Sequence, residues 1–107
     1  GDERAKLALD MFCYRAAKHL AEVAVSLSRL DHLVFTGGIG ENSIYVRKTI
    51  TGYLKTLQIK LDDQANEQSP RGEACVISPP KAKVTIWVIP TNEELMIAQD
   101  AAHFIEQ

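Results

Sequence analysis

A glycine-rich run between two apolar segments is the first feature of this sequence that could do chemistry. Residues 35–42 read FTGGIGEN, with three glycines in four positions where a buried strand is expected to turn into a helix. Glycines at such a junction allow positive φ angles or the close approach of another group. The start of a helix adds free N–H groups and the positive end of a dipole, which suits the polar groups of a nucleotide. The alternative interpretation is a tight turn that only requires small residues.

Two known nucleotide motifs can be compared with this run. It is not a P-loop, because no Gly-Lys-Ser/Thr follows it. It fits the dinucleotide-binding fingerprint in part: Gly38 and Gly40 supply the first two glycines, and Asp62 lies near the distance expected for a ribose-binding acid. Ser43 occupies the third glycine position, however, and a long helix precedes the strand. A Rossmann-like or other free-standing nucleotide-binding module without catalysis is therefore the alternative function.

A second expected strand-to-helix junction, at residues 89–95, carries carboxylates. Thr91 and Glu94 fit a capping box, in which the threonine caps the helix and the glutamate reaches back to the cap's N–H group. Glu93 then has no capping role. Because ligands gather at the carboxyl ends of strands in open α/β sheets, a carboxylate there could hold Mg²⁺. The alternative is a surface glutamate that stabilises the helix dipole.

The spacing of apolar residues predicts the elements that must position these junctions. Helices are expected over residues 3–30, 44–57 and 91–106, the first with an apolar stripe that includes Leu7, Met11 and Leu20, and the second capped by Asn42 or Ser43. Strands are expected over residues 33–36, 59–62, 75–78 and 84–89, with a polar loop over residues 62–73. This order predicts an α/β chain with a mixed or mostly parallel sheet and flanking helices.

Composition and charge exclude several classes of protein. The chain has 107 residues, of which 46% are hydrophobic and 24% charged, as in ordinary globular domains. The net charge of −2 argues against a nucleic-acid partner. No run of about 18 apolar residues and no signal-peptide pattern is present, so no membrane partner is expected.

The cysteines and histidines indicate no metal site. Cys13 and Cys75 are far apart and form no CxxC pair, and the three histidines do not cluster. We interpret both cysteines as small apolar residues in a reducing cytoplasm, with a disulfide or a reactive thiol as the alternative.

The motifs also resemble a known family. The sequences VFTGGIGENS at residues 34–43 and VIPTNEELMIAQD at residues 88–100 closely resemble the C-terminal end of acetate and propionate kinases. Residues 1–15 resemble the helix that precedes the glycine loop in that family, and the chain begins without Met. The resemblance implies that residues 1–107 are the C-terminal part of the second of two actin-like, RNase H-like ATPase domains in a longer protein.

The resemblance implies an activity for the parent protein. These kinases transfer a phosphoryl group reversibly between ATP and a short carboxylate, forming an acyl phosphate and ADP. By the same resemblance, Gly38, Ile39, Gly40, Glu41 and Asn42 line the adenosine end of the ATP site. The sequence does not distinguish acetate from propionate as the substrate.

The resemblance further implies that Glu93 contributes to the Mg²⁺ site. The arginines, the catalytic aspartate and the histidines of the family lie in earlier segments, so no catalytic residue is expected here and the chain alone should be inactive. The expected partners are the rest of the kinase chain, the small carboxylate and a second copy in a homodimer.

Overall fold

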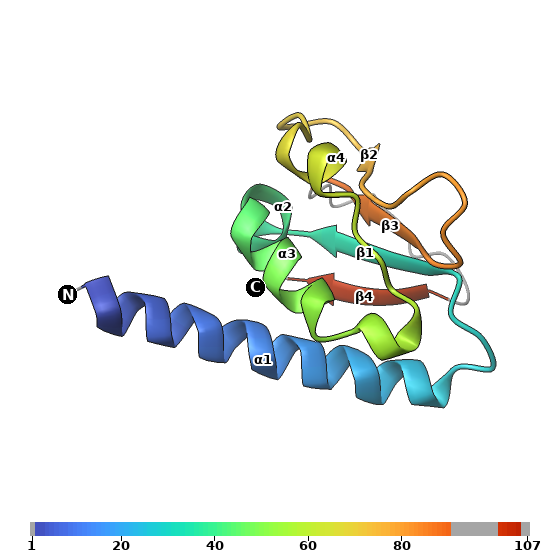
Figure 1. Ribbon diagram of the computed structural model, residues 1–107, viewed down its shortest axis with the longest axis horizontal. Helices are drawn as coiled ribbons and strands as arrows, with labels where there is room; N and C mark the ends of the chain where they lie inside the picture. Colours follow the sequence, from blue (N-terminus) through green and yellow to red (C-terminus); the bar gives the residue numbers. More distant parts are fainter. Residues whose placement is uncertain (1, 91–100, 106–107) are drawn as a thin grey trace.

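The computed structural model of the chain describes residues 2–90 and 101–105, which form helices packed on a mixed sheet (Figure 1). The helices are α1 (Asp2–Ser26), α2 (Gly38–Asn42), α3 (Ile44–Gly52), the 3-10 helix η1 (Lys55–Leu57) and α4 (Asp63–Glu67). The strands are β1 (His32–Thr36), β2 (Cys75–Val76), β3 (Thr85–Val88) and β4 (Ala101–Ile105). Within the described residues the sheet has four strands in the order β2-β3-β1-β4, which confirms the predicted mixed α/β class.

Strand β1 lies at the centre of the sheet because its side chains are apolar on both faces. It pairs in parallel with β3 and with β4, while β2 pairs antiparallel with β3. Leu33 lies opposite Ile86, and Phe35 lies opposite Val88. These four side chains lie on one face of the sheet, and all are buried. Residues 33–36 of β1 are buried without a break, as expected for a strand covered on both sides.

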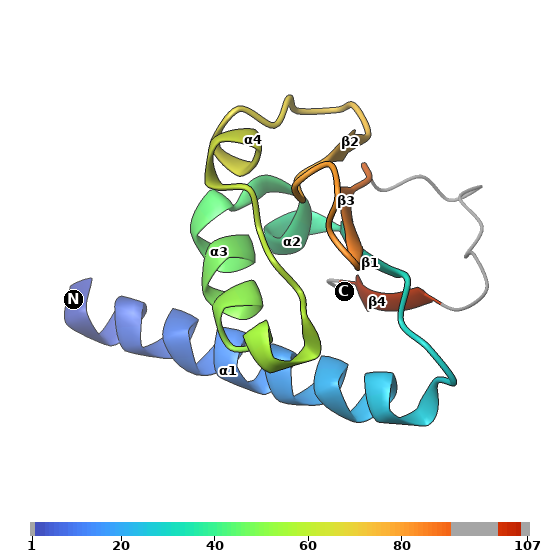
Figure 2. The same ribbon diagram turned by 45° about the vertical axis from the view of Figure 1, so that its right-hand side comes forward.

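Helix α1 packs against α3 and β4 through small side chains, and its predicted apolar stripe is only partly correct. Cys13, Ala16 and Leu20 are buried, whereas Leu7 is 60% exposed and Met11 is 46% exposed. A helix of 25 residues is about 37 Å long at 1.5 Å per residue, which is longer than the elements that it covers. Its first turns therefore extend past α3, as both views show (Figures 1 and 2).

Helix α3 begins where the sequence predicted and ends earlier. The Ser43 side chain caps it by accepting a hydrogen bond from the Val46 N–H at 3.1 Å, which confirms one of the two predicted caps. The helix ends at Gly52, and the chain continues through η1 to Gln58, which adopts a positive φ of 63°. The Tyr45 hydroxyl donates to the Asp10 carboxylate and so ties α3 to α1.

Residues 59–78 differ from the prediction in three places. The expected strand over residues 59–62 is not formed: Ile59 is buried in the core, and the Asp62 carboxylate caps α4 by accepting from the Ala65 N–H at 3.1 Å. The predicted polar loop thus contains a short helix. The third predicted strand is shortened to Cys75–Val76, and the Ile77 N–H donates to the Ile86 carbonyl at 2.8 Å just beyond it.

The predicted closing helix is wrong in its last turns. Residues 91–100 lie outside the described residues, but Ala101–Ile105 form β4, a strand parallel to β1. A short apolar segment can satisfy the N–H and C=O groups along the outer edge of β1, which would otherwise lack partners within the sheet. Among the described helices, none has both the length and the apolar character needed to cross a membrane.

Candidate functional site

The glycine run lies at the carboxyl end of the central strand. β1 ends at Thr36, and Gly37 turns the chain with a φ of 79°, a conformation that favours glycine. Residues 38–42 then form α2, in which the Glu41 N–H donates to the Gly37 carbonyl at 2.7 Å. The Asn42 side chain donates to the Gly38 carbonyl at 3.1 Å. The chain therefore passes from strand to helix with one residue between them.

The structure corrects part of the interpretation of these glycines. Gly37 and Gly72 are the glycines with positive φ in the part of the chain that the structure describes. Gly38 and Gly40 lie within α2, a one-turn helix separate from α3, so backbone geometry alone does not require glycine at either position. The exposed Gly38 leaves the backbone of α2 without a side chain toward solvent, which is compatible with close contact by a ligand.

The carbonyl end of α2 is closed by a buried arginine from the next helix. Arg47 is 1% exposed, and its Nη1 donates to the Glu41 carbonyl at 2.7 Å and to the Gly40 carbonyl at 3.3 Å. On the other side its Nε donates to the Asn66 Oδ1 at 2.6 Å, and its Nη2 to the Ser69 Oγ at 2.9 Å. Burial lowers the pKa of the Arg47 guanidinium, and these acceptors compensate the charge for its lost water.

Sequence reasoning missed this arginine network. The sequence predicts no structural role for Arg47, and Asn66 lies in the segment that it predicts as a polar loop. One signal was present: Arg47 lies beside Val46 on the face that also carries the buried Ile50 and Thr51, where a charged residue needs a fixed partner.

The described start of the second junction, residues 89 and 90, lies at the same edge of the sheet as the glycine run. The Ile89 N–H donates to the Phe35 carbonyl at 2.9 Å, so the chain leaves β3 beside the turn at Gly37. Glu93, the predicted Mg²⁺ ligand, lies outside the described residues, as do Thr91 and Glu94. Within residues 2–90 and 101–105, no group of three or more His, Cys, Asp or Glu side chains is arranged to hold a metal ion.

The structure argues against Asp62 as the ribose-binding acid that the dinucleotide-binding alternative requires. It requires the Asp62 carboxylate to bind a ribose, whereas that carboxylate caps α4 and the Asp62 N–H donates to the Ile77 carbonyl at 2.8 Å. Asp62 therefore has a local structural role, as the N-cap of α4.

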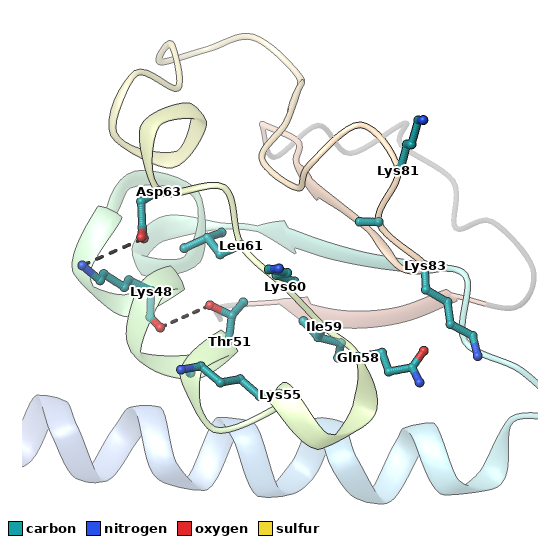
Figure 3. A pocket seen from close by; sticks show the side chains of 12 residues that line it. Lys48, Thr51, Lys55, Gln58, Ile59, Lys60, Leu61, Asp63, Lys81 and Lys83 are labelled. Carbon is teal, nitrogen blue, oxygen red and sulfur yellow. Dashed lines mark hydrogen bonds and ion pairs between the residues drawn. The ribbon is translucent and has the colours of Figure 1, made fainter.

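A cavity of about 770 Å³ lies beside α3 and shares no lining residue with the glycine run (Figure 3). Lysines 48, 55, 60, 81 and 83 line it, with Asp63 as the acidic residue among the lining side chains. Lys48 pairs with Asp63 at 3.9 Å. In Figure 3 the side chains of Lys48, Lys81 and Lys83 point in different directions and do not converge on one point. The cavity therefore lacks the arrangement expected of an anion site.

Comparison with known proteins places this geometry in one family. The model of the acetokinase family matches residues 1–99. The chain is 49% identical over 105 residues to an acetate kinase of Carboxydothermus hydrogenoformans, covering 98% of this chain and 26% of that protein. It is 53% identical over 102 residues to acetate kinase 1 of Neisseria meningitidis, covering 95% of this chain and 26% of that protein.

Solved structures of acetate and propionate kinases contain a region with the same fold as this chain. The acetate kinase of Porphyromonas gingivalis superposes with a TM-score of 0.79 at 41% identity, covering 88% of this chain and 23% of that one. A propionate kinase of Francisella tularensis gives a TM-score of 0.75 at 46% identity, covering 94% of this chain and 25% of that one. The chain thus spans about a quarter of the length of the relatives it matches.

Proposed function

Since this chain belongs to the acetokinase family, we propose that it is the C-terminal part of a kinase that transfers a phosphoryl group between ATP and acetate or propionate. The products in the forward direction are an acyl phosphate and ADP. The observation that carries the proposal is the family match over residues 1–99, which includes both the glycine run and Glu93. The described geometry supports it, because the glycine run lies at the carboxyl edge of the sheet, where α/β proteins bind ligands.

We propose that Gly38, Ile39, Gly40, Glu41 and Asn42 line the adenosine end of the ATP site. Gly38 is exposed on α2, directly after the turn at the end of β1. A flat base and its ribose can approach a backbone without Cβ atoms more closely than one with side chains. Phosphoryl transfer depends mainly on positioning and charge neutralisation, so binding and orientation are what this segment would contribute.

We propose that Glu93 contributes to the Mg²⁺ site of the nucleotide. Mg²⁺ bound with a nucleotide usually takes one or two carboxylates besides phosphate oxygens and water. This proposal is supported by the exit of the chain from β3 beside Gly37, four residues before Glu93 in the sequence. Mg²⁺, when bound, would neutralise charge on the phosphate oxygens. Glu93 would hold it in place and take no part in bond formation.

The remaining expectations stay proposals for the longer protein. Residues 1–107 would belong to its second domain, with the rest of the kinase chain as their partner and a homodimer as the assembly. The exposed Leu7, Met11 and Tyr14 on α1 support a covered surface there. A cytoplasmic location is supported by Cys13 and Cys75, both of which are free thiols.

The full-length protein should form acyl phosphate from ATP, Mg²⁺ and a short carboxylate. The measurement is hydroxylamine trapping of the acyl phosphate, run with acetate and with propionate, and in reverse as ATP formation from acetyl phosphate and ADP. A protein that binds ATP but phosphorylates neither carboxylate would contradict the proposed reaction. The ratio of kcat/KM for the two acids would identify the preferred substrate.

In the full-length protein, the Gly38→Ala substitution should raise the KM for ATP by at least about tenfold with little change in the KM for acetate. The new Cβ would project from α2 where the adenosine is proposed to lie. Stability should not fall, because Ala favours a helix over Gly by roughly 0.5–1 kcal/mol.

Gly52→Ala is the matched control for this substitution. A Cβ at Gly52 would meet nothing within 4 Å, so this variant should keep the wild-type KM for ATP. Equal KM values for ATP in the wild type and the Gly38→Ala variant would remove α2 from the proposed nucleotide site.

A further inference from the structure

Arg47 connects α2 to a part of the chain that is distant in sequence. It belongs to α3, yet its guanidinium contacts the last carbonyls of α2 and two residues at the end of α4. A helix of five residues leaves its C-terminal carbonyls without partners inside the helix. The guanidinium supplies those partners for Gly40 and Glu41, and its positive charge also suits the negative end of the helix dipole.

On the α4 side of the network, Asn66 is buried and Ser69 is half-buried. Asn66 is 1% exposed; its side-chain oxygen accepts from the Arg47 Nε at 2.6 Å, and its backbone carbonyl accepts from Nη2 at 3.2 Å. Its Nδ2 donates to the Ile44 carbonyl at 3.1 Å, at the start of α3. Ser69 accepts from the Arg47 Nη2 at 2.9 Å and donates to the Asn66 carbonyl at 3.0 Å. Each of these acceptors fixes one edge of the planar guanidinium.

Helix α4 is itself tied to the sheet. Asp62, its N-cap, donates its N–H to the Ile77 carbonyl, and the Ile77 N–H donates to the Ile86 carbonyl in β3. A continuous set of hydrogen bonds therefore runs from β3 through α4 and Arg47 to the backbone of α2. Helix α2 is thus connected to the sheet at both of its own ends. Its N-terminus follows β1 directly, and its C-terminus is connected through this hydrogen-bond network.

We infer that Arg47, Asn66 and Ser69 form a clamp that holds the backbone of α2 in the orientation that receives the nucleotide. This inference rests on the proposed function. The three side chains are positioning residues: their hydrogen bonds are with the carbonyls of Gly40, Glu41 and Ile44 and with one another. An apolar side chain of similar volume could fill the same space, often with equal stability of the fold. It could not donate hydrogen bonds to the two α2 carbonyls, and so it could not fix their orientation.

The competing explanation is that the network only packs α3 against α4. In that case, its loss would lower stability without changing the motion of α2 or the binding of ATP. The two explanations differ in what happens to residues 38–42 in a protein that is still folded, which an activity measurement alone would not reveal.

The experiment uses the full-length protein with Arg47→Lys, Asn66→Ala and Ser69→Ala. Lysine keeps the positive charge but lacks the forked guanidinium that reaches both α2 and α4. Ser69→Ala removes a single hydrogen-bond acceptor and is the mildest of the three variants, so it can be measured even if the other two do not fold. Asp63→Asn is the control, because Asp63 lies on α4 but is exposed and pairs with Lys48. The readouts are hydrogen exchange of a peptide spanning residues 38–43 without nucleotide, the KM values for ATP and acetate, kcat, and the melting temperature.

We expect exchange in residues 38–43 to accelerate by at least about tenfold in Arg47→Lys and Asn66→Ala, and by less in Ser69→Ala. The KM for ATP should rise by at least about fivefold, with kcat and the KM for acetate within about twofold of wild type. Asp63→Asn should match the wild type in every readout.

Wild-type exchange in the folded clamp variants would overturn the inference, and so would faster exchange with an unchanged KM for ATP. A wild-type protein that does not use ATP would refute the proposed function instead, and the exchange measurement would still decide whether the clamp holds α2.

Discussion

The isolated 107-residue chain should make no acyl phosphate from ATP, Mg²⁺ and acetate, whereas the full-length protein should do so. The chain spans about a quarter of its relatives. The family resemblance assigns to other segments the arginines that bind the carboxylate and stabilise the transition state, and also the catalytic aspartate. Each preorganised donor lost from such a site costs roughly 10²–10³ in kcat, so losing the whole set should lower activity by at least about 10⁴-fold.

The measurement is hydroxylamine trapping of acyl phosphate over a buffer blank, with the full-length protein as the positive control. The same chain carrying Glu93→Ala, purified in parallel, is the matched control for a contaminating host kinase. Activity that is equal in both preparations comes from a contaminant. Activity that scales with the concentration of the wild-type chain, survives repurification and is lost in the Glu93→Ala chain would show that the segment is catalytic by itself.

In the full-length protein, Glu93→Gln should lower kcat by at least about 100-fold and raise the Mg²⁺ concentration needed for half-maximal activity. The substitution keeps the shape of the side chain and removes the charge that is proposed to hold the metal. That charge matters most when negative charge builds on the transferring phosphoryl group. The free energy of unfolding should change by less than about 1 kcal/mol, because only an interaction with the dipole of the helix predicted from residue 91 would be lost.

Glu94→Gln is the matched control, since it removes the neighbouring carboxylate by the same chemical change. The sequence predicts Glu94 at the third position of a capping box, where Gln serves as well as Glu, so kcat and the Mg²⁺ dependence should stay within about twofold of wild type. A greater loss of turnover in Glu94→Gln than in Glu93→Gln would reverse the assignment of the two carboxylates.

The arginine network changes how the polar segment after α3 is interpreted. Residues 62–73 resemble a surface loop in composition, and they are the least distinctive part of the sequence. In the structure this segment supplies Asn66 and Ser69 to the guanidinium that closes α2. A substitution in α4 can therefore affect the proposed nucleotide site without touching the nucleotide, which is what the clamp variants measure.

Local sequence patterns predicted the elements whose stability is local. Ser43 was one of two predicted caps, because its side chain can satisfy an N–H group three residues away, as it does for Val46. Residues 33–36 were recognised as a buried strand because an unbroken apolar run suits a strand covered on both faces. The residues proposed for the nucleotide and Mg²⁺ sites, in α2 and at Glu93, come from sequence alone, through the glycine run, the carboxylates at the second strand-to-helix junction and the family resemblance, and they stay predictions.

The tertiary structure decided the features that depend on distant partners. Leu7 continues the periodic stripe of α1 but is exposed, because α1 is longer than the layer it covers. Residues 101–105 have a helical pattern but form β4, because the edge of β1 offers hydrogen bonds that no local pattern reveals. In the sequence, Arg47 is one of several arginines in predicted helices. In the folded chain, two α2 carbonyls and Asn66 surround its guanidinium. A buried charge is tolerated only where several acceptors meet, and such a meeting is set by the packing of elements that lie far apart in the sequence.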